Sequence, residues 1–589
     1  MFRPFFSTVL VAALSVSGLA QESGRRVDGK DLPEQVRAYL SRLEGFGFSG
    51  AALVAKDGRV LVETAHGLAD RKSKTPVRAD TIFDIGSVTK QFTAAAILLL
   101  ESDGKLRVTD PLAKYLKGVP ADKAGITIHH LLTHTSGLAM GFGGDYEKVS
   151  REAVVSRAMA SELQSPPGQR HAYSNAGYSL LAAVVEVASG QSFETFLRER
   201  LFRPAGMSTS GYFFTGRDEG RLARGYEGGE DWGIGAEKAA ATGGDFWNLL
   251  GNGGVHSTVG DMYKWMDALQ KGKVLSKEAR EKFFRPHVLV SADYRKSGSP
   301  LYYAYGWYVW KRPGKTLIFH LGGNGVFNAA VRYHLDERAV VIYASNTSEF
   351  HDPSYPVPAI ERMLAGEAVP LPPVVLALTG QQMAEHAGRY GAASGAVLSV
   401  EANGPFLKVQ GEGQEAFSFV TNGRWQKDAA LEALNVRTAE VVENSRTRKY
   451  EAVLKEYGLE TTLERLAEFE ASFWKKRHER HGGYVRTRVL GTLPSRGRAF
   501  VGTTIVAIDF ERGPAYREYL WTPGGKIGDL GPLSSAPSAR YFPESAVCFV
   551  RFEPAEAVVS SRICLDKDDR RGKVATVVQG ERRVELRKL

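Results

Sequence analysis

Cysteine is scarce in this sequence, since only Cys548 and Cys564 occur among 589 residues. Their spacing fits neither a zinc site nor a catalytic cysteine motif, and no metal ion is expected. The segment that contains them, AVCFVRFEPAEAVVSSRICLD, alternates like a β-hairpin with its midpoint near Glu556. Paired strands would place the two cysteines opposite each other, at a distance that a disulfide can bridge. The sequence therefore allows a disulfide, and two free buried thiols are the alternative.

Long apolar runs are absent beyond the N-terminus. Residues 1–20 combine an early arginine, a short apolar stretch and small residues at Gly18 and Ala20, which is typical of a secretory signal cut after Ala20. The apolar run is shorter than the about 20 residues that span a bilayer, and an uncleaved anchor is the alternative. We therefore expect a secreted or periplasmic protein with no stable membrane span after signal cleavage.

Two further signatures are missing. No Gly-x-Ser-x-Gly motif occurs, which excludes the nucleophile elbow of α/β-hydrolases. No nucleic-acid-binding motif occurs either, although the formal net charge is +10 and residues 471–589 hold 22 Lys+Arg against 13 Asp+Glu. A basic region of this kind can contact anionic polymers. We expect no nucleic-acid partner, favour a solvated surface, and leave contact with an anionic cell envelope open.

The order of the expected elements predicts an α/β fold of the α+β type at 28–365. Residues 31–44 are typical of an amphipathic helix, and a hairpin is expected around Asp57-Gly58. Residues 86–103 are expected to be helical, and a series of strands begins at Leu301. Helices packed on an antiparallel sheet are the simplest architecture for this pattern.

A Pro-rich stretch at 366–380 indicates a linker. Strand-like segments and helical spacing beyond it predict three further parts. These are a small β domain at 381–446, a helical segment at 447–480 and a C-terminal β domain at 483–589.

A serine and a lysine open an apolar run in FDIGSVTKQFTAAAILLL, residues 83–100. Positions three apart lie on one helix face, so Ser87 and Lys90 can touch. A serine hydroxyl needs a base to become a nucleophile, and a helix start adds N–H groups that suit an oxyanion. The same spacing occurs at Ser102 and Ser472, but only Ser87 opens an apolar helix. Taken alone, the pattern equally fits a capping serine and a snorkelling lysine.

Two later segments add groups of the same chemistry. Tyr173 and Asn175 stand just before an expected helix, where a phenol near an ammonium could ionise more easily and carry protons. The amide of Asn175 could hold a peptide group of a substrate. His320 is followed by Gly322 and Gly323, which let a ligand approach the backbone closely.

Together and in this order, these elements resemble the serine β-lactamase and penicillin-binding-protein superfamily, in its class C-like branch. The matching elements are Ser87-Val-Thr-Lys90, Tyr173-Ser-Asn175 and His320-Leu-Gly322, and LLTHTSGL at 131–138 is also similar. The resemblance covers roughly 30–365. It implies an antiparallel sheet flanked by helices, a helical subdomain, and an active site between the two.

The resemblance also implies roles for individual residues and no cofactor. Ser87 would be the acylated nucleophile, and Lys90 would help to deprotonate it. Tyr173 would pass the proton to the leaving group and activate the deacylating water. The substrate would be bound by the Asn175 amide and by an oxyanion hole made of the backbone N–H groups of Ser87 and Gly323, with His320 and Gly322 lining the far side.

One element departs from the pattern, because His320 stands where antibiotic-destroying and cell-wall members mostly have lysine. A histidine is mostly neutral near pH 7, so a substrate carboxylate loses part of its ionic anchor. The histidine form resembles the esterase and D-aminopeptidase side of the superfamily. We therefore expect an exported serine hydrolase that acts through an acyl-enzyme on small esters or D-amino-acid amides and peptides.

Two alternatives remain at this point. One is a D-Ala-D-Ala carboxypeptidase or β-lactamase acting on cell-wall peptides or penicillins. The other is a non-catalytic relative that binds the cell envelope. The C-terminal part resembles the β-barrel domains of D-aminopeptidases, and residues 384–409 resemble the lipocalin-like tails of other members.

Overall fold

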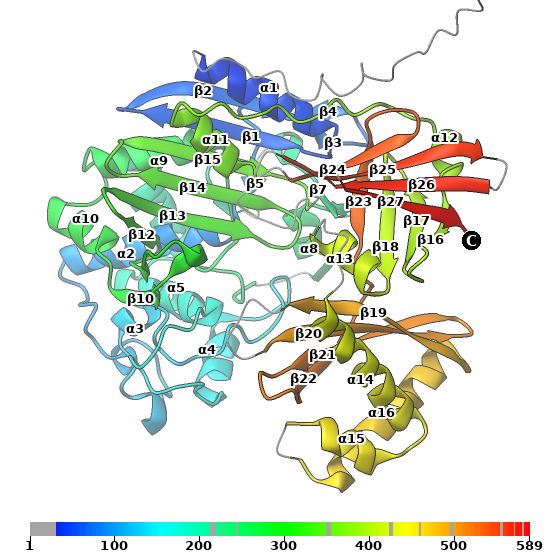
Figure 1. The fold of residues 1–589 in the computed structure, drawn as a ribbon. Helices are drawn as coiled ribbons and strands as arrows, with labels where there is room; N and C mark the ends of the chain where they lie inside the picture. Colours follow the sequence, from blue (N-terminus) through cyan, green and yellow to red (C-terminus); the bar gives the residue numbers. More distant parts are fainter. Residues whose placement is uncertain are drawn as a thin grey trace, which may run out of the picture. The chain divides into compact units, whose positions relative to one another are not determined.

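The computed structural model of the chain forms two compact units, shown in Figure 1. It describes residues 31–589 apart from 213–218, 228, 243–245, 349–354, 423–427, 459–460, 495–499, 554–557, 570–571 and 580–581. The expected signal at 1–20 lies outside the described residues. One unit runs to Leu371, and the other comprises Pro372–Glu553 and Ala557–Leu589. The boundary falls inside the predicted linker, in a stretch without helix or strand between residues 367 and 379.

The first unit is built on an eight-stranded antiparallel sheet with the order β10-β11-β12-β13-β14-β15-β1-β2. The hairpin β1–β2 turns at Asp57-Gly58, as the sequence predicts. Its strands are β1 (Gly50–Lys56), β2 (Arg59–His66), β10 (Val288–Ser291), β11 (Leu301–Tyr303), β12 (Tyr308–Arg312), β13 (Lys315–Gly323), β14 (Asn328–His334) and β15 (Ala339–Ser345).

Helices cover this sheet. The predicted helix at 31–44 forms α1 (Leu32–Glu44), which is capped by Asp31 and packs on α11 (Val357–Leu364) and β2. α9 (Val259–Gln270) packs on β1 and β15. Alternate residues of β1, Ala51 and Leu53, join the core that includes α9, because side chains of a strand alternate between its two faces.

A helical subdomain stands beside the sheet and carries the first two sequence motifs. Its central pair is α2 (Lys90–Ser102) and α5 (Asn175–Ser189), which pack on each other. Among the described residues, no single helix is long and apolar enough to cross a membrane, and only the bent pair 175–189 and 193–205 passes that test jointly. The other helices of the unit are α3 (Ile128–Leu132), α4 (Arg151–Ala160), α6 (Phe193–Leu197), α7 (Arg203–Ala205), α8 (Gly235–Thr242) and α10 (Lys277–Phe284).

Short strands connect the two parts of the first unit. A three-stranded sheet with the order β5-β9-β6 leads directly into the Ser87 motif, because β5 ends at Asp84. The short strands are β3 (Leu68–Asp70), β4 (Thr75–Pro76), β5 (Phe83–Asp84), β6 (Gly211–Tyr212), β7 (Gly225–Glu227), β8 (Glu230–Gly233) and β9 (Val255–Ser257).

The second unit corrects the predicted division of the C-terminal part. Strands from both sides of residues 414–533 close into one barrel, so 381–446 and 483–589 are not separate β domains. Closure removes the exposed edges that either group of strands alone would leave. The barrel consists of β16 (Gly388–Gly391), β17 (Val397–Asn403), β18 (Phe406–Glu412), β23 (Ala539–Pro543), β24 (Cys548–Glu553), β25 (Val558–Asp569), β26 (Gly572–Gln579) and β27 (Arg582–Lys588). Cys548 and Cys564 are direct partners on β24 and β25 and form a disulfide.

The insertion between β18 and β23 has a core of its own. Its four-stranded sheet, in the order β19-β20-β21-β22, packs against α14 and α16. Helices begin well before the predicted position 447, since α13 starts at Gln414 and α14 at Ala429. The elements of the insertion are α13 (Gln414–Asn422), α14 (Ala429–Arg446), α15 (Tyr450–Glu456), α16 (Leu463–His481), β19 (Tyr484–Pro494), β20 (Gly502–Phe510), β21 (Gly513–Trp521) and β22 (Ile527–Leu533). α12 (Gly380–Ala384) precedes the barrel strands and packs on β17.

Candidate active site

Ser87 lies in a tight turn between β5 and α2. The turn is a 3₁₀ helix, Gly86–Thr89, and α2 begins only at Lys90. The sequence predicted one continuous helix, yet the expected contact is made, since side chains three residues apart eclipse each other in a 3₁₀ helix. Ser87 remains partly exposed, so a substrate can reach its hydroxyl.

Two glycines let this turn approach the end of β13. A Cβ atom at Gly322 would lie 1.9 Å from the carbonyl oxygen of Ile85, and one at Gly86 would lie 2.6 Å from the backbone nitrogen of Gly323. Gly86 also has φ +48°, a conformation that glycine adopts most easily. The backbones that carry Ser87 and Gly323 are therefore in contact, as an oxyanion hole made from both requires.

Lys90 is fully buried beside Ser87. Its Nζ lies 2.9 Å from Ser87 Oγ and 2.7 Å from the carbonyl oxygen of Asn252. Burial lowers the pKa of Lys90 well below its usual value, and the opposing charge of Asp145 offsets only part of this effect. A neutral amine 2.9 Å from a serine hydroxyl can accept its proton.

Tyr173 stands directly before α5, with its ring centroid 4.8 Å from Lys90 Nζ. Burial raises the pKa of Tyr173 well above its usual value, and a hydrogen bond with Ser87 offsets only part of the increase. The expectation that an ammonium would ease ionisation of this phenol is therefore wrong. Desolvation acts on both groups, so it favours the uncharged amine of Lys90 and the protonated phenol of Tyr173.

Asn175 is the first residue of α5. Its backbone N–H donates to Met140 O at 2.7 Å, while its Oδ1 atom is buried and has no hydrogen-bond partner among the described residues. Ser174 accepts a hydrogen bond from Gly177 N and so caps the helix. The unpaired Oδ1 atom of Asn175 can accept a hydrogen bond from a substrate N–H group.

His320 lies on β13 and is only 1% exposed. Its Nδ1 atom lies 2.7 Å from Leu321 O, and its Nε2 atom lies 3.2 Å from the Tyr303 hydroxyl. A carbonyl can only accept, so Nδ1 carries the proton and Nε2 accepts from Tyr303. Burial, together with Lys90, lowers the pKa of His320 to about 3. His320 is therefore neutral and offers no positive charge to a substrate.

Residues outside the three motifs complete the site. Asn252 supplies the carbonyl that holds Lys90, and its side chain donates to Ser179 Oγ at 2.8 Å. The His134 ring contacts the Tyr173 ring at 4.2 Å between centroids, and His134 accepts a hydrogen bond from Ser174 N at 3.0 Å. His134 lies in LLTHTSGL, which resembles the family in sequence, but no pattern indicated that the Asn252 carbonyl faces Lys90. Within the described ranges no group of His, Cys, Asp or Glu side chains could hold a metal ion.

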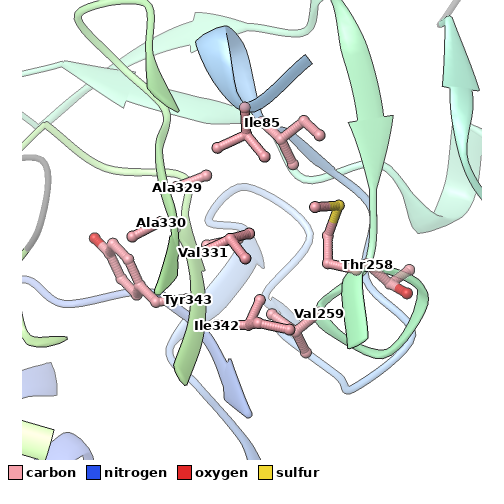
Figure 2. Close-up of a pocket in the computed structure, with 11 residues that line it drawn as sticks. Ile85, Thr258, Val259, Ala329, Ala330, Val331, Ile342 and Tyr343 are labelled. Atoms are coloured by element: carbon pink, nitrogen blue, oxygen red, sulfur yellow. The ribbon is translucent and has the colours of Figure 1, made fainter. Parts of the chain in front are cut away.

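Figure 2 shows a small apolar cavity beside Ile85, two residues before Ser87 in the chain. Ile85, Val331 and Ile342 line it together with the start of α9 at Val259. Its lining contains none of the candidate catalytic or substrate-binding side chains. It is a packing gap between the sheet and α9 and not the substrate site.

The comparison with known families agrees with this geometry. The family model described as Beta-lactamase matches residues 41–360, which is more than half of the chain. The chain belongs to the β-lactamase family. Its motif residues Ser87, Lys90, Tyr173, Asn175 and His320 all lie inside the matched range.

Relatives in this family include peptidases and an esterase. The chain is 30% identical over 345 residues to "Penicillin-binding protein 4*" of Bacillus subtilis, covering 55% of this chain and 74% of the relative. It is 30% identical to the "D-alanyl-D-alanine-carboxypeptidase/endopeptidase AmpH" of Escherichia coli (44% and 67% covered) and 34% identical to "Esterase EstB" of Burkholderia gladioli (27% and 46% covered). The protein is thus a serine hydrolase of the β-lactamase and penicillin-binding-protein type.

A solved structure shares the fold over most of the chain. The octameric penicillin-binding-protein homologue from Pyrococcus abyssi matches 95% of this chain and 100% of its own, with a TM-score of 0.51 at 19% identity. At that identity the match concerns the fold alone.

Proposed function

We propose that this protein hydrolyses small esters or D-amino-acid amides and peptides through an acyl-enzyme on Ser87. The observation that carries the proposal is the buried Lys90 amine, whose pKa burial lowers, 2.9 Å from the partly exposed Ser87 hydroxyl. This pair supplies a base and a nucleophile without a cofactor.

In the acylation step, Ser87 Oγ attacks the carbonyl carbon of the substrate and its proton passes to Lys90 Nζ. The developing oxyanion accepts hydrogen bonds from the backbone N–H groups of Ser87 and Gly323. Tyr173, which holds its proton, donates it to the departing oxygen or nitrogen as the bond to the carbonyl carbon breaks. The proton on Lys90 then replaces the one that Tyr173 has lost, so both groups return to their starting states.

Deacylation repeats these transfers with water. Lys90 removes a proton from a water molecule that attacks the acyl carbon, Tyr173 donates its proton to Ser87 Oγ, and the proton on Lys90 then replaces the one that Tyr173 has lost. The Oγ–acyl bond breaks, and Ser87 recovers its proton. Asn175 Oδ1, which lacks a protein partner among the described residues, holds an N–H group of amide substrates during both steps.

The neutral His320 supports the choice of substrate. A carboxylate next to the scissile bond, as in penicillins and C-terminal D-alanine peptides, needs a cation for strong binding. His320 is buried, hydrogen-bonded at both nitrogens and uncharged. Esters and amides without such a carboxylate need no cation at this position, so we expect them to be the favoured substrates.

We also propose that the protein acts outside the cytoplasm, as residues 1–20 suggest, and that the basic C-terminal region contacts an anionic cell envelope. Fractionation of cells that express the full chain tests both ideas. Mature protein that stays in the cytoplasm would contradict export. Mature protein released from envelopes without any dependence on salt would contradict the ionic contact.

The first experiment is a hydrolysis panel with the protein from Gln21 onward and Ser87→Ala as its control. The panel contains a p-nitrophenyl ester, a D-alanyl anilide, a chromogenic cephalosporin and a peptide ending in D-Ala-D-Ala. We expect Ser87-dependent turnover of the ester or anilide and little of the cephalosporin. Dominant release of D-alanine would favour the carboxypeptidase alternative, and no turnover at all would favour the non-catalytic one.

A further inference from the structure

Two side chains outside the catalytic motifs join the Ser87 turn to the end of β13. Asp84 is the last residue of β5 and is 4% exposed. Its Oδ1 atom accepts a hydrogen bond from the backbone N–H of Gly86 at 2.8 Å. Its Oδ2 atom accepts one from Asn324 Nδ2 at 2.9 Å. One carboxylate therefore bridges two segments that are 240 residues apart in the sequence.

The orientation of Asn324 is fixed by its own turn. Its Oδ1 atom accepts hydrogen bonds from the backbone N–H groups of Val326 at 3.0 Å and Phe327 at 2.8 Å. Since the amide oxygen is occupied by two donors, the NH₂ group must face Asp84. The bridge thus has a defined polarity, with an acceptor on β5 and a donor after β13.

The hydrogen bonds of Asp84 lie next in sequence to the two expected oxyanion donors, the backbone N–H groups of Ser87 and Gly323. Asp84 holds Gly86, the residue before Ser87, and Asn324 directly follows Gly323. The glycine contacts between these segments set how closely they approach but include no directional side-chain bond. A directional bond beside that contact can fix how the Ser87 and Gly323 N–H groups are aligned.

We propose that Asp84 and Asn324 are positioning residues that hold the two halves of the oxyanion hole in register. This inference rests on the proposed function, because it assigns the pair a part in forming the acyl-enzyme.

The charge of Asp84 indicates that its role is geometric. A carboxylate so close to the nucleophile repels a developing oxyanion. Burial raises the pKa of Asp145, and the charge of Asp84 raises it further. Electrostatics alone would therefore favour a neutral residue at position 84. A negative side chain is useful there because it accepts two hydrogen bonds at once.

An exchange of the two side chains tests the inference. In D84N the new NH₂ group faces the NH₂ group of Asn324, and in N324D two carboxylates face each other, so each single variant breaks the bridge. In D84N/N324D the amide at position 84 still accepts from Gly86 and now donates to the carboxylate at 324. That carboxylate still accepts from Val326 and Phe327. All four hydrogen bonds are therefore restored, and only the one between positions 84 and 324 has its donor and acceptor exchanged.

The readout is the labelling rate with a fluorophosphonate, in which Ser87 Oγ bonds to phosphorus, fluoride leaves and the phosphoryl oxygen occupies the oxyanion hole. kcat and KM for a p-nitrophenyl ester are measured beside it. We expect each single variant to lose about tenfold or more in labelling rate and kcat with little change in KM, since loss of one oxyanion donor costs about 10²–10³-fold. The double variant should return to within roughly threefold of the natural chain.

Asp261→Asn provides a matched control. Asp261 is 1% exposed and accepts hydrogen bonds from Thr209 N at 2.8 Å, Ser210 Oγ at 3.0 Å and Lys264 Nζ at 2.8 Å, and none of these partners belongs to the Ser87 turn. D261N should lower the thermal midpoint and leave the labelling rate unchanged.

Two results would overturn the inference. One is unchanged labelling in both single variants, and the other is a folded double variant that labels no faster than they do. Failure of the natural chain to be labelled at Ser87 would instead overturn the proposed function, so the two failures are distinguishable.

Discussion

Each unit of the molecule buries a cationic side chain, and the two burials have opposite consequences. In the first unit, Lys90 contacts a hydroxyl and a carbonyl, and no described carboxylate forms an ion pair with it. In the second unit, Arg517 is 2% exposed and donates to both oxygens of Glu470, at 2.7 and 2.8 Å. Ser445 and Tyr457 also bond to Glu470.

The directions of the pKa changes follow from these partners. Burial lowers the pKa of Lys90 well below its usual value. Burial acts in the same direction on Arg517, but Tyr519 and the hydrogen bonds to Glu470 outweigh it and raise the pKa. A buried lysine without a counter-charge becomes a base, whereas a buried arginine with one becomes a structural anchor. Burial alone therefore does not identify a functional residue; the nature of its partners does.

Lys90→Met should give the largest effect and tests the first half of this contrast. The variant keeps the apolar volume and removes the base, so kcat for ester hydrolysis should fall by about 10³-fold. The free energy of unfolding should not fall, since folding no longer has to remove a proton from the lysine. Ester kinetics measure the change in kcat, and a thermal melt measures the change in stability. A variant that keeps most of its kcat would show that Lys90 is not the base.

Arg517→Met tests the second half. It leaves Glu470 buried without its cation, and the unfolding free energy of the second unit should fall by about 3–5 kcal/mol. Denaturation followed by tryptophan fluorescence measures the loss, and turnover by Ser87 should be unchanged under native conditions. The control R517M/E470L removes both charges and should recover much of the loss. Equal stability of R517M and the natural chain would break the comparison.

The pH dependence of activity and of stability tests the lowered pKa of Lys90. Burial lowers the pKa of Lys90, so kcat/KM should rise with pH through this lowered pKa and then stay level. No alkaline fall from Tyr173 is expected below pH 10, because its pKa is raised. Stability should also rise with pH between the lowered pKa of Lys90 and its unfolded value of about 10.4. A plateau reached only near pH 10 would show that Lys90 is charged at neutral pH.

His320→Lys should give the smallest effect. It replaces a neutral imidazole with an amine that can take a proton and pair with a substrate carboxylate. The ratio of cephalosporin to ester kcat/KM should rise by about tenfold, which corresponds to one charge-assisted hydrogen bond. His320→Gln, which stays neutral, is the control and should leave the ratio unchanged. An equal ratio in both variants would remove His320 from the account of substrate choice.

Much of the catalytic unit could be predicted from the sequence, because its motifs and secondary structure depend on residues that are close together in the chain. The spacing of Ser87 and Lys90, the hairpin at Asp57-Gly58 and the helix at 31–44 each depend on residues close together in the chain. The C-terminal part was predicted less well. β18 pairs with β23 across an insertion of more than a hundred residues, and no periodicity within either segment signals that partner.

The sequence by itself determined which groups are available for chemistry: a serine, a lysine and a tyrosine in family order, and a histidine in place of a second lysine. Only the tertiary structure decided their charge states. Desolvation depends on every atom packed around a group, and those atoms come from β13, α5 and the stretch at 251–258. The same holds for the bridge from Asp84 to Asn324, because a hydrogen bond between distant segments exists only once the fold has brought them within 3 Å.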